Sequence, residues 1–540
     1  MPAADEVACR TTGADDMPGA DEVTVADLVR RAHERYATQP AVLTPQGSVS
    51  FAELAGTVRR LTRALAALGC RRGDRVVLAL ENSAELMALE HAVFVCGLVR
   101  VAVSARLHPA EIAFVAQDCG ARVVVCEAAA AAILSGRRAD LPELAALVTP
   151  TAGTGTDTTY AEMLRSGLDG RAWDAGADPD DIAALLYTSG TTGRPKGAMV
   201  THRAWVGMLA EYCAQLPPMG PGDVVLHTAP MSHFGGSVGS ACTLRGAAAV
   251  ILRRFDPMET LRTIERHRAT TVPLVPTMLK ELTAAAAAGA YDLGSVRAIP
   301  YGGASIGPAA AARAHEVFGE VLYQFYGLSE ALAPLSVLSA RDHRHQPGRP
   351  LPGRLASAGR LCPCVDVKVV PGPVRPDGAG EIHVRGGPVM RGYWNAPEQT
   401  SAVLRDGWFS TGDVGFVDDE GYLRIVDRSR DVVISGGFNV YPGEVERVIE
   451  SLDGVQEAVV VGVPHPRWGE AVAAVVVTEA GHRIEASDIV DVCRSSLAGF
   501  KKPVYVEFAD RLPRTGTGKV SRRQVRDLYW PVRAPRQCDG

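Results

Sequence analysis

Residues 187–197 read YTSGTTGRPKG, and this stretch decides the fold that the chain is expected to adopt. It follows the apolar run from Ile182 to Tyr187, which is typical of a short buried strand. The stretch therefore leaves the carboxyl end of a strand, where α/β sheets usually place their ligands. Its glycines let backbone N–H groups turn toward an anion, its hydroxyls add donors, and Lys196 adds a mobile positive charge. The pattern predicts a polyphosphate-binding loop made of Thr188, Ser189, Gly190, Thr191, Thr192, Gly193 and Lys196.

Two other interpretations of the stretch explain less of it. A flexible Gly/Ser/Thr linker would not need an apolar strand before it or a Pro-Lys-Gly ending. A Walker-type loop requires Gly, four residues, and then Gly-Lys-Ser/Thr. Neither this stretch nor the run around Gly518 and Lys519 fits, because Val520 supplies no hydroxyl and Pro513 stands where the first glycine should be.

The stretch resembles the phosphate-binding signature of the adenylate-forming superfamily, which includes acyl-CoA synthetases, adenylation domains of peptide synthetases, and luciferases. The resemblance implies that ATP and Mg²⁺ are cofactors and that a small-molecule carboxylic acid is the substrate. It also implies that the acid is first converted to an acyl-adenylate. The later motifs decide the branch of the superfamily.

The rest of the chain predicts an α/β fold with a large N-terminal and a small C-terminal domain. Strands alternate with helices through the first half, for example at residues 76–80, 85–97 and 122–126, which favours parallel sheets with helices on both faces. Residues 381–422 change to short strands with Gly and Asp turns, as in a small barrel-like subdomain. Residues 442–497 form a compact α+β pattern. We expect a disordered N-terminus at 1–20, an adenylation domain at 21–430 and a mobile domain at 431–540, with Arg430 as the hinge.

Composition excludes several function classes. The chain has 540 residues and a net charge of −5, so it gives no reason to expect a nucleic-acid partner. Its eleven cysteines are odd in number and scattered, unlike a disulfide framework. It contains no apolar run long enough for a membrane span, and its first residues lack a signal-peptide core. The cytoplasm is the expected compartment, and a homodimer is left open.

Two further motifs gain meaning from the resemblance. The segments 301–304 (YGGA) and 324–330 (QFYGLSE) each follow an apolar run. In the family, the first lines the adenine slot, which here places Gly302, Gly303 and Ala304 beside the base. The resemblance also implies that Tyr326 stacks on the base and Gln324 reads its edge, while Gly327 makes the turn. Ser329 would bind the α-phosphate, and Glu330 would hold Mg²⁺, because a carboxylate oxygen suits this hard cation.

The carboxyl-terminal half supplies the ribose and catalytic residues that the resemblance implies. Asp413, in WFSTGD, would accept hydrogen bonds from both ribose hydroxyls, and Arg428 would reach the ribose and phosphate. Without the resemblance, Asp413 would more often be a turn-capping residue. Lys519, in LPRTGTGKV, resembles the family's catalytic lysine. Its charge would bridge the acid carboxylate and the phosphates while pyrophosphate leaves.

The identity of the acceptor is more open than the adenylation step. Segments 435–446 and 465–470 resemble the CoA-ligase branch, in which Gly436, Gly437, Trp468, Phe500 and Lys502 would serve CoA. His233, in PMSHFGG, would stand between the acyl tunnel and the pantetheine channel. Small residues follow it, so aromatic, cinnamic-type and medium-chain acids are all compatible. Many relatives carry a base where this chain has Val504, which weakens the case for CoA.

The sequence therefore predicts an AMP-forming acid–CoA ligase. One alternative keeps adenylation and changes the acceptor to a carrier protein or an amine, or activates an unusual anion such as nitrite. Another, from a different class, is a non-catalytic nucleotide-binding protein. Lys196, Glu330, Asp413, Arg428 and Lys519 together argue against that second alternative.

Overall fold

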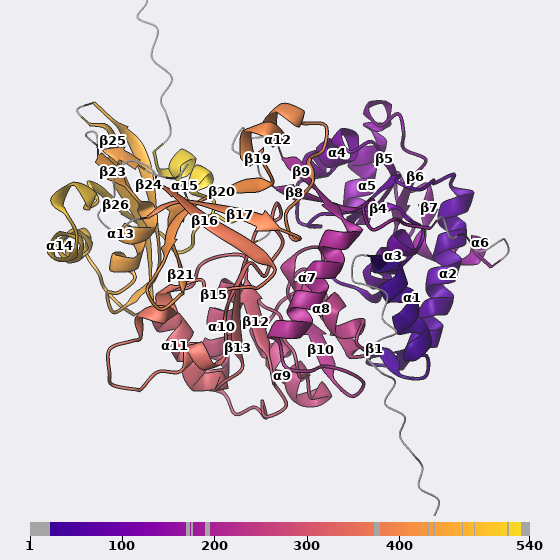
Figure 1. Cartoon of the computed structure of the whole chain (residues 1–540), viewed down its shortest axis with the longest axis horizontal. Helices are drawn as coiled ribbons and strands as arrows, with labels where there is room; N and C mark the ends of the chain where they lie inside the picture. The colour runs from indigo at the N-terminus through magenta and orange to yellow at the C-terminus, as the bar shows by residue number, and fades with distance from the viewer. Residues whose placement is uncertain are drawn as a thin grey trace, which may run out of the picture.

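Four sheets and a C-terminal module with a fifth sheet make up the described part of the computed structural model of the chain (Figure 1). It describes residues 22–168, 173, 176–188, 195–371, 379–428, 431, 433–435, 438–466, 468–479, 481–515 and 518–530. The predicted disordered segment 1–20, the loop residues Ser189 to Gly193, the hinge Arg430, and Gly436 and Gly437 lie outside these residues. The backbone of Arg428 is described, but its side chain is not.

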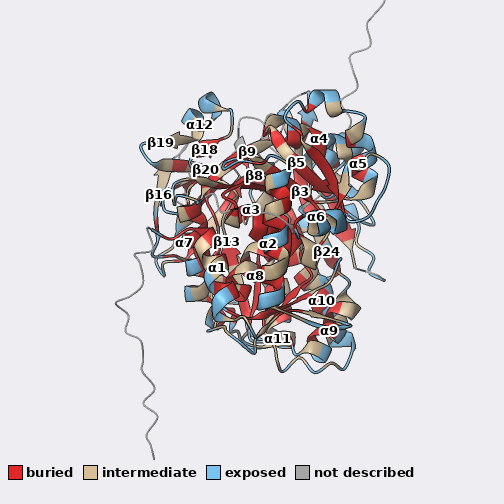
Figure 2. Ribbon diagram, turned by 90° about the vertical axis from the view of Figure 1, so that its right-hand side faces the viewer, coloured by how far each residue is buried: buried red, intermediate tan, exposed pale blue. Residues whose placement is uncertain are grey.

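The first sheet has eight strands in the order β18-β9-β8-β4-β3-β5-β6-β7. Its parallel part consists of β3 (Arg75–Ala79), β4 (Val99–Ala102), β5 (Ala121–Cys126), β6 (Ala146–Thr149), β7 (Thr158–Thr159) and β8 (Ile182–Thr188). Its helices are α1 (Val25–Arg35), α2 (Phe51–Ala67), α3 (Ala84–Val95), α4 (Pro109–Asp118), α5 (Ala128–Ser135) and α6 (Tyr160–Ser166). Buried residues line the strands of this sheet, and exposed residues occupy the outer faces of the helices (Figure 2). Ser50 is the N-cap of α2, and its side chain accepts from the backbone N–H of Glu53.

The predicted phosphate loop closes a hairpin. β8 pairs antiparallel with β9 (Lys196–Thr201), and Thr188 faces Lys196 in the register. β18 (Gly392–Tyr393) adds to the other edge of β9. The strand β9 was missed from sequence, because residues 196–201 mix lysine, glycine and threonine with only a short apolar core. The hairpin fixes the two ends of the loop at the carboxyl end of β8, and β8 runs parallel to β4 in the eight-stranded sheet.

The second and third sheets run next to each other. One contains β1 (Pro40–Thr44), β2 (Gly47–Ser50), β10 (Val224–His227) and β11 (Ala248–Ile251). The other contains β12 (Ile299–Gly302), β13 (Leu322–Tyr326), β14 (Ser336–Leu338) and β15 (Arg360–Leu361). Thr271 forms parallel bridges to Val225 and to Ala298, which link β10 to β12 through the expected strand segment at 271–275. The helices are α7 (His202–Gln215), α8 (Phe234–Thr243), α9 (Pro257–His267), α10 (Pro276–Ala288) and α11 (Pro308–Phe318).

The barrel-like subdomain is an antiparallel sheet, as the turn pattern predicted. It contains β16 (Val365–Pro371), β17 (Gly380–Gly386), β19 (Leu404–Arg405), β20 (Trp408–Val417) and β21 (Leu423–Arg428), beside α12 (Pro397–Val403). A fifth sheet forms the C-terminal module from β22 (Val433–Ser435), β23 (Phe438–Val440), β24 (Val455–His465), β25 (Gly469–Thr478) and β26 (Tyr505–Phe508). Helices α13 (Pro442–Ile449) and α14 (Ala486–Ser496) share one buried cluster with this sheet, and α15 (Arg522–Tyr529) shares another. The predicted α/β fold with a large N-terminal and a small C-terminal domain is confirmed.

Glycines let α8 lie close to the end of β10. A Cβ on Gly236 would lie 1.7 Å from the carbonyl oxygen of Met231, so no side chain fits there. We expect Gly236→Ala to lower the free energy of unfolding by about 1–3 kcal/mol through overpacking. The matched control is Gly207→Ala in α7, where an added Cβ meets nothing within 4 Å. The control should raise the free energy of unfolding by roughly 0.5–1 kcal/mol, because alanine is the better helix former. Denaturant unfolding of both variants measures this, and equal effects would contradict the close packing.

Six histidines are kept neutral by the fold. Burial lowers the pKa of His33, His202, His227, His233 and His343 to about 4, and that of His91 to about 3. In the unfolded chain they take up protons as the pH falls through about 6.5. Stability contributed by the neutral forms is therefore present above this pH and is lost as the pH falls toward 4. We expect the melting temperature to begin its decline near pH 6.5. A melting temperature that stays level down to pH 4.5 would contradict this.

Candidate functional site

Glu330 is the point at which three segments of the chain meet. Thr188, the last residue of β8, donates its hydroxyl to Oε1 of Glu330 at 3.1 Å. Tyr393 of β18 donates its hydroxyl to the same oxygen at 3.0 Å. Lys196, the first residue of β9, places Nζ 5.1 Å from the centre of the Tyr393 ring, within cation–π range. The hairpin that carries the phosphate loop is thus connected directly to the predicted metal-binding carboxylate.

The hydrogen bonds to Glu330 leave a place for a cation. Both described donors use Oε1, so Oε2 remains for a metal ion. The described part of the chain contains no cluster of three or more His, Cys, Asp or Glu residues that could hold a metal by itself. A single carboxylate is the donor set expected for Mg²⁺ that is bound mainly through substrate phosphates. The residues present therefore fit this ion.

Lys519 of the C-terminal module reaches the Gly302–Ala304 turn at the end of β12. A Cβ on Gly303 would lie 3.9 Å from Cε of Lys519, and Gly303 has a φ of +84°, which favours glycine. Burial lowers the pKa of His233, and the charges of Arg100 and Lys519 lower it further. Ser232 Oγ lies 2.7 Å from Nδ1 of His233. The structure therefore brings two predicted catalytic residues and the predicted adenine loop together.

Tyr326 and Asp413 hold each other in place. The Tyr326 hydroxyl donates to Oδ2 of Asp413 at 2.6 Å. Asp413 is 3% exposed and lies on β20, opposite Arg428 of β21 in the strand register. Gly302 and Phe325 are partners in the parallel pair β12 and β13, so the Gly303 turn and Tyr326 follow adjacent strand ends. The predicted base-stacking and ribose-binding residues are therefore in contact, although Tyr326 belongs to the sheet of β13 and Asp413 to the sheet of β20.

Gln324 is engaged by protein groups at both ends of its amide. Tyr301 donates its hydroxyl to Oε1 of Gln324 at 3.1 Å, and Nε2 of Gln324 donates to the Ser357 carbonyl at 3.2 Å. Tyr301 Oη also lies 2.7 Å from Nε2 of His343. The second N–H of the amide and the second lone pair of Oε1 remain for a base edge. Gly327 directly follows β13, and the close approach of Ala333 requires a glycine there, because a Cβ would lie 2.5 Å from Cα of Ala333.

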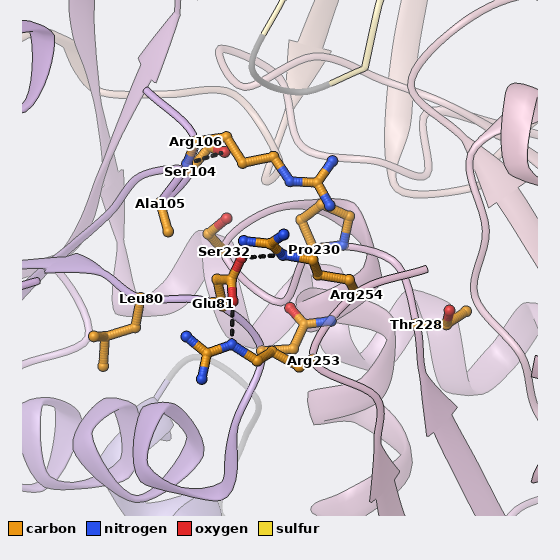
Figure 3. Close-up of a pocket in the computed structure, with 11 residues that line it drawn as sticks. Leu80, Glu81, Ser104, Ala105, Arg106, Thr228, Pro230, Ser232, Arg253 and Arg254 are labelled. Carbon is orange, nitrogen blue, oxygen red and sulfur yellow. Dashed lines mark hydrogen bonds and ion pairs between the residues drawn. The ribbon is translucent and has the colours of Figure 1, made fainter. Parts of the chain in front are cut away.

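Two cavities lie near these segments. One, of about 30 Å³, is lined by residues that follow β3, β4, β10 and β11, and Figure 3 shows Glu81 bonded to both Arg253 and Arg254 within it. Glu127 also accepts from Arg253 at 3.2 Å, so carboxylates offset both arginine charges. The other, of about 190 Å³, is lined by Cys213, Pro218, Met219 and Arg245 near the ends of α7 and α8.

Comparisons with known proteins agree with this geometry. The family model of the AMP-binding enzyme matches residues 29–394, and that of the AMP-binding enzyme C-terminal domain matches residues 444–519. The chain belongs to the AMP-binding enzyme family. It is 37% identical to a feruloyl-CoA synthase of Amycolatopsis sp over 491 residues, which cover 89% of this chain and 94% of that protein. It is 34% identical to a long-chain-fatty-acid–CoA ligase of Mycobacterium tuberculosis over 489 residues, 89% of this chain and 93% of that protein.

Among solved structures, amide bond synthetase McbA of Marinactinospora thermotolerans matches with a TM-score of 0.81 and 32% identity, over 93% of this chain and 99% of that one. ATP-bound MatB of Rhodopseudomonas palustris matches with a TM-score of 0.81 and 31% identity, over 94% and 99%. The predicted membership of the adenylate-forming superfamily, in its acyl-CoA ligase branch, is confirmed. So is the prediction of an AMP-forming acid–thiol ligase.

The residues predicted to serve CoA in this AMP-binding enzyme lie on the C-terminal module. Trp468 stacks on His465 at 4.3 Å in the turn between β24 and β25, and it is 37% exposed. Phe500 is 39% exposed in the short helix Gly499–Lys501, and Lys502 follows it. Lys501, next to both, pairs with Glu444 of α13. No helix among the described residues is long and apolar enough to cross a membrane.

Two supporting groups of the AMP-binding enzyme were missed from sequence. Tyr393 was not among the predicted site residues, although its hydroxyl holds Glu330. Arg100 is 3% exposed, bonds Glu90 at 2.7 Å, and donates to the Ser232 carbonyl at 3.3 Å, just before His233. A charged residue inside the apolar run of β4 was the only sequence signal for Arg100.

Proposed function

We propose that this enzyme is an ATP-dependent carboxylic acid–CoA ligase that forms an acyl-adenylate and then an acyl-CoA thioester. The observation that carries the proposal is Lys519 of the C-terminal module, which lies beside Gly303 of the N-terminal domain and whose charge helps to lower the pKa of His233. That arrangement suits the first half-reaction. The acid is an aromatic, cinnamic-type or medium-chain acid, in keeping with relatives named feruloyl-CoA synthase and long-chain-fatty-acid–CoA ligase.

In the first half-reaction, an oxygen of the acid carboxylate attacks the α-phosphorus of ATP, and the bond to the β-phosphate oxygen breaks. Both reactants are anions, so the Lys519 ammonium between them reduces their repulsion and stabilises the charge on departing pyrophosphate. Lys196 and the hydroxyls of the loop after β8 hold the phosphates. Glu330 would hold Mg²⁺, which neutralises phosphate charge when bound. Tyr326, Asp413 and Arg428 hold the base and the ribose.

In the second half-reaction, the CoA sulfur attacks the acyl carbonyl, the thiol proton is lost, and AMP leaves. Lys519 has no part in this step, so the C-terminal module can rotate about Arg430 and bring Gly436 and Gly437 toward the acyl-adenylate. Trp468, Phe500 and Lys502 would bind the CoA nucleotide, and His233 would border the channel. Because His233 is neutral, it adds no charge beside the thioester. As part of this proposal, the adenylation domain comprises residues 21–430 and the mobile domain residues 431–540. The cytoplasmic location stays a prediction.

An amine acceptor is a second candidate. The similarity to amide bond synthetase McbA favours it, and Val504, 40% exposed, replaces the base that many CoA-using relatives carry. AMP release measured with CoA, with an amine, and with neither, over a panel of aryl and alkyl acids, separates the two. AMP release that is stimulated by CoA supports the acid–CoA ligase proposal. AMP release that is stimulated only by the amine would contradict that proposal and favour amide synthesis.

Lys519→Ala should lower acid-dependent pyrophosphate exchange by roughly 10²- to 10³-fold, because the charge that bridges the two anions is lost. Thiolation of a supplied acyl-adenylate should remain near the wild-type rate. Arg523→Ala, which removes an exposed charge of the same module, is the control and should leave both rates unchanged. Equal loss of both half-reactions in Lys519→Ala would contradict the division of roles.

Tyr393→Phe should raise the Mg²⁺ concentration needed for half-maximal pyrophosphate exchange by about three- to ten-fold, because Glu330 loses one of its two hydroxyl donors. The rate at saturating Mg²⁺ should be largely kept. Tyr422→Phe is the matched control, since that hydroxyl donates to Asp342 at 2.8 Å instead. A Mg²⁺ dependence that is the same in both variants would rule out the positioning role of Tyr393.

A further inference from the structure

His227, the last residue of β10, is a buried imidazole without a hydrogen-bond partner. It is 2% exposed, and neither Nδ1 nor Nε2 has a partner among the described residues. Other buried histidines differ: His33 and His91 bond each other at 3.1 Å, and Nδ1 of His343 lies 2.7 Å from the Ser339 carbonyl. Leaving both nitrogen atoms of a buried imidazole without a hydrogen bond is unfavourable, so this arrangement calls for a structural or functional explanation.

The ring lies directly beneath α8. A Cβ on Gly239 would lie 1.9 Å from Cε1 of His227, so glycine is required where the helix crosses the imidazole. Strand alternation places His227 on the same face of the β10 strand as Val225, which shares a buried cluster with Phe325 of β13. His227 and Phe325 therefore lie on the face of the linked sheets that α8 covers (Figure 1).

The aromatic end of this layer is next to the reaction centre. Phe234 is the first residue of α8, and a Cβ added to Gly302 would lie 3.5 Å from its Cε2 atom. Its ring centre is 6.2 Å from that of Phe325, and the centre of Tyr212 is 5.4 Å from that of Phe325. From Phe234 to Gly239, α8 rises about 7.5 Å. That is about the length of a phenyl-substituted three-carbon acid whose carboxylate is held beside Gly302.

We propose that His227 is a specificity-determining residue that hydrogen-bonds a ring hydroxyl at the far end of an aromatic acid. This inference rests on the proposed ligase function and narrows its substrate class to hydroxylated aryl acids. A neutral imidazole offers one hydrogen-bond donor and one acceptor, and a hydroxyl group can accept from the first or donate to the second. Tyr212, Phe234 and Phe325 supply the flat apolar surface that an aromatic ring favours. Burial keeps the imidazole neutral, since it lowers the pKa of His227 to about 4.

The rival occupant is an alkyl chain. Beyond His227, α8 continues to Cys242, whose Sγ lies 3.1 Å from Sδ of Met219, and Met219 lines the cavity of about 190 Å³. A long alkyl acid would have to pass the unpaired imidazole to reach that cavity. It would then leave both ring nitrogens unsatisfied, which disfavours this occupant.

The test compares two acids that differ only in the hydroxyl, 4-hydroxycinnamic acid and cinnamic acid, with octanoic acid as the alkyl probe. The measurement is kcat/KM for acid-dependent pyrophosphate release. The wild-type enzyme should prefer the hydroxylated acid by roughly 10- to 100-fold. His227→Phe should bring that ratio near one by losing activity on 4-hydroxycinnamic acid alone, and His227→Asn, which keeps a donor and an acceptor, should retain part of it.

His202→Phe is the matched control. His202 is also buried, its Nδ1 accepts from the Val25 N–H at 3.3 Å, and its Nε2 is unpartnered among the described residues. This control should leave the ratio between the two acids unchanged even if it lowers stability. If His227→Phe does not fold, the test rests on the ratio of kcat/KM for the two aryl acids in the wild-type enzyme and in His227→Asn.

A wild-type ratio near one, or a ratio that is unchanged in His227→Phe, would overturn the inference. If the enzyme acts on octanoic acid and does not discriminate between the two aryl acids, the inference about His227 is overturned, but the proposed ligase function is not. Pyrophosphate release with none of the acids, in wild-type enzyme that is folded, would instead count against the proposed function.

Discussion

The adenylation chemistry depends on bringing one cation between two anions that repel each other. The cation comes from a module that is separate in sequence and in its hydrophobic core. Near the start of that module, the Gly443 N–H donates to Asp427 at 2.7 Å, and Tyr441 shares a small buried cluster with Val414 and Val426. Arg313 and Glu479 form an ion pair at 4.0 Å. Exposed ion pairs of this length contribute little free energy. The buried cluster is small and the ion pair is weak, which is compatible with the proposed rotation of the module.

The N-terminal side of the site is built differently, from strand ends held by hydroxyls. Thr188 and Tyr393 fix Glu330, and Tyr326 fixes Asp413. The hydroxyl groups of these donors are neutral. They orient the two carboxylates without adding a charge of their own, whereas a hydrogen bond from a charged group would be a stronger contact.

Much of the fold followed from local sequence. The alternation of strands and helices depends on neighbouring residues, and it is present as predicted. Motif residues of the site were found because they occur in continuous runs. The residues that support them were not. The Tyr393–Glu330 and Tyr301–Gln324 hydrogen bonds join positions whose proximity is set by sheet register. Short-range patterns contain no information on that register.

The division between the domains also explains how one family can serve several acceptors. Under the proposed function, the groups that contact the acid and the nucleotide lie at strand ends of the N-terminal domain, and the module contributes Lys519. The exposed side chains of Trp468, Phe500 and Val504 lie on the module. Under the same proposal, substitutions on that surface would change which nucleophile approaches the acyl-adenylate and would leave its formation unaffected. Similarity to CoA ligases and to an amide bond synthetase is therefore compatible with one shared first step, and the acid and the acceptor are selected by different parts of the chain.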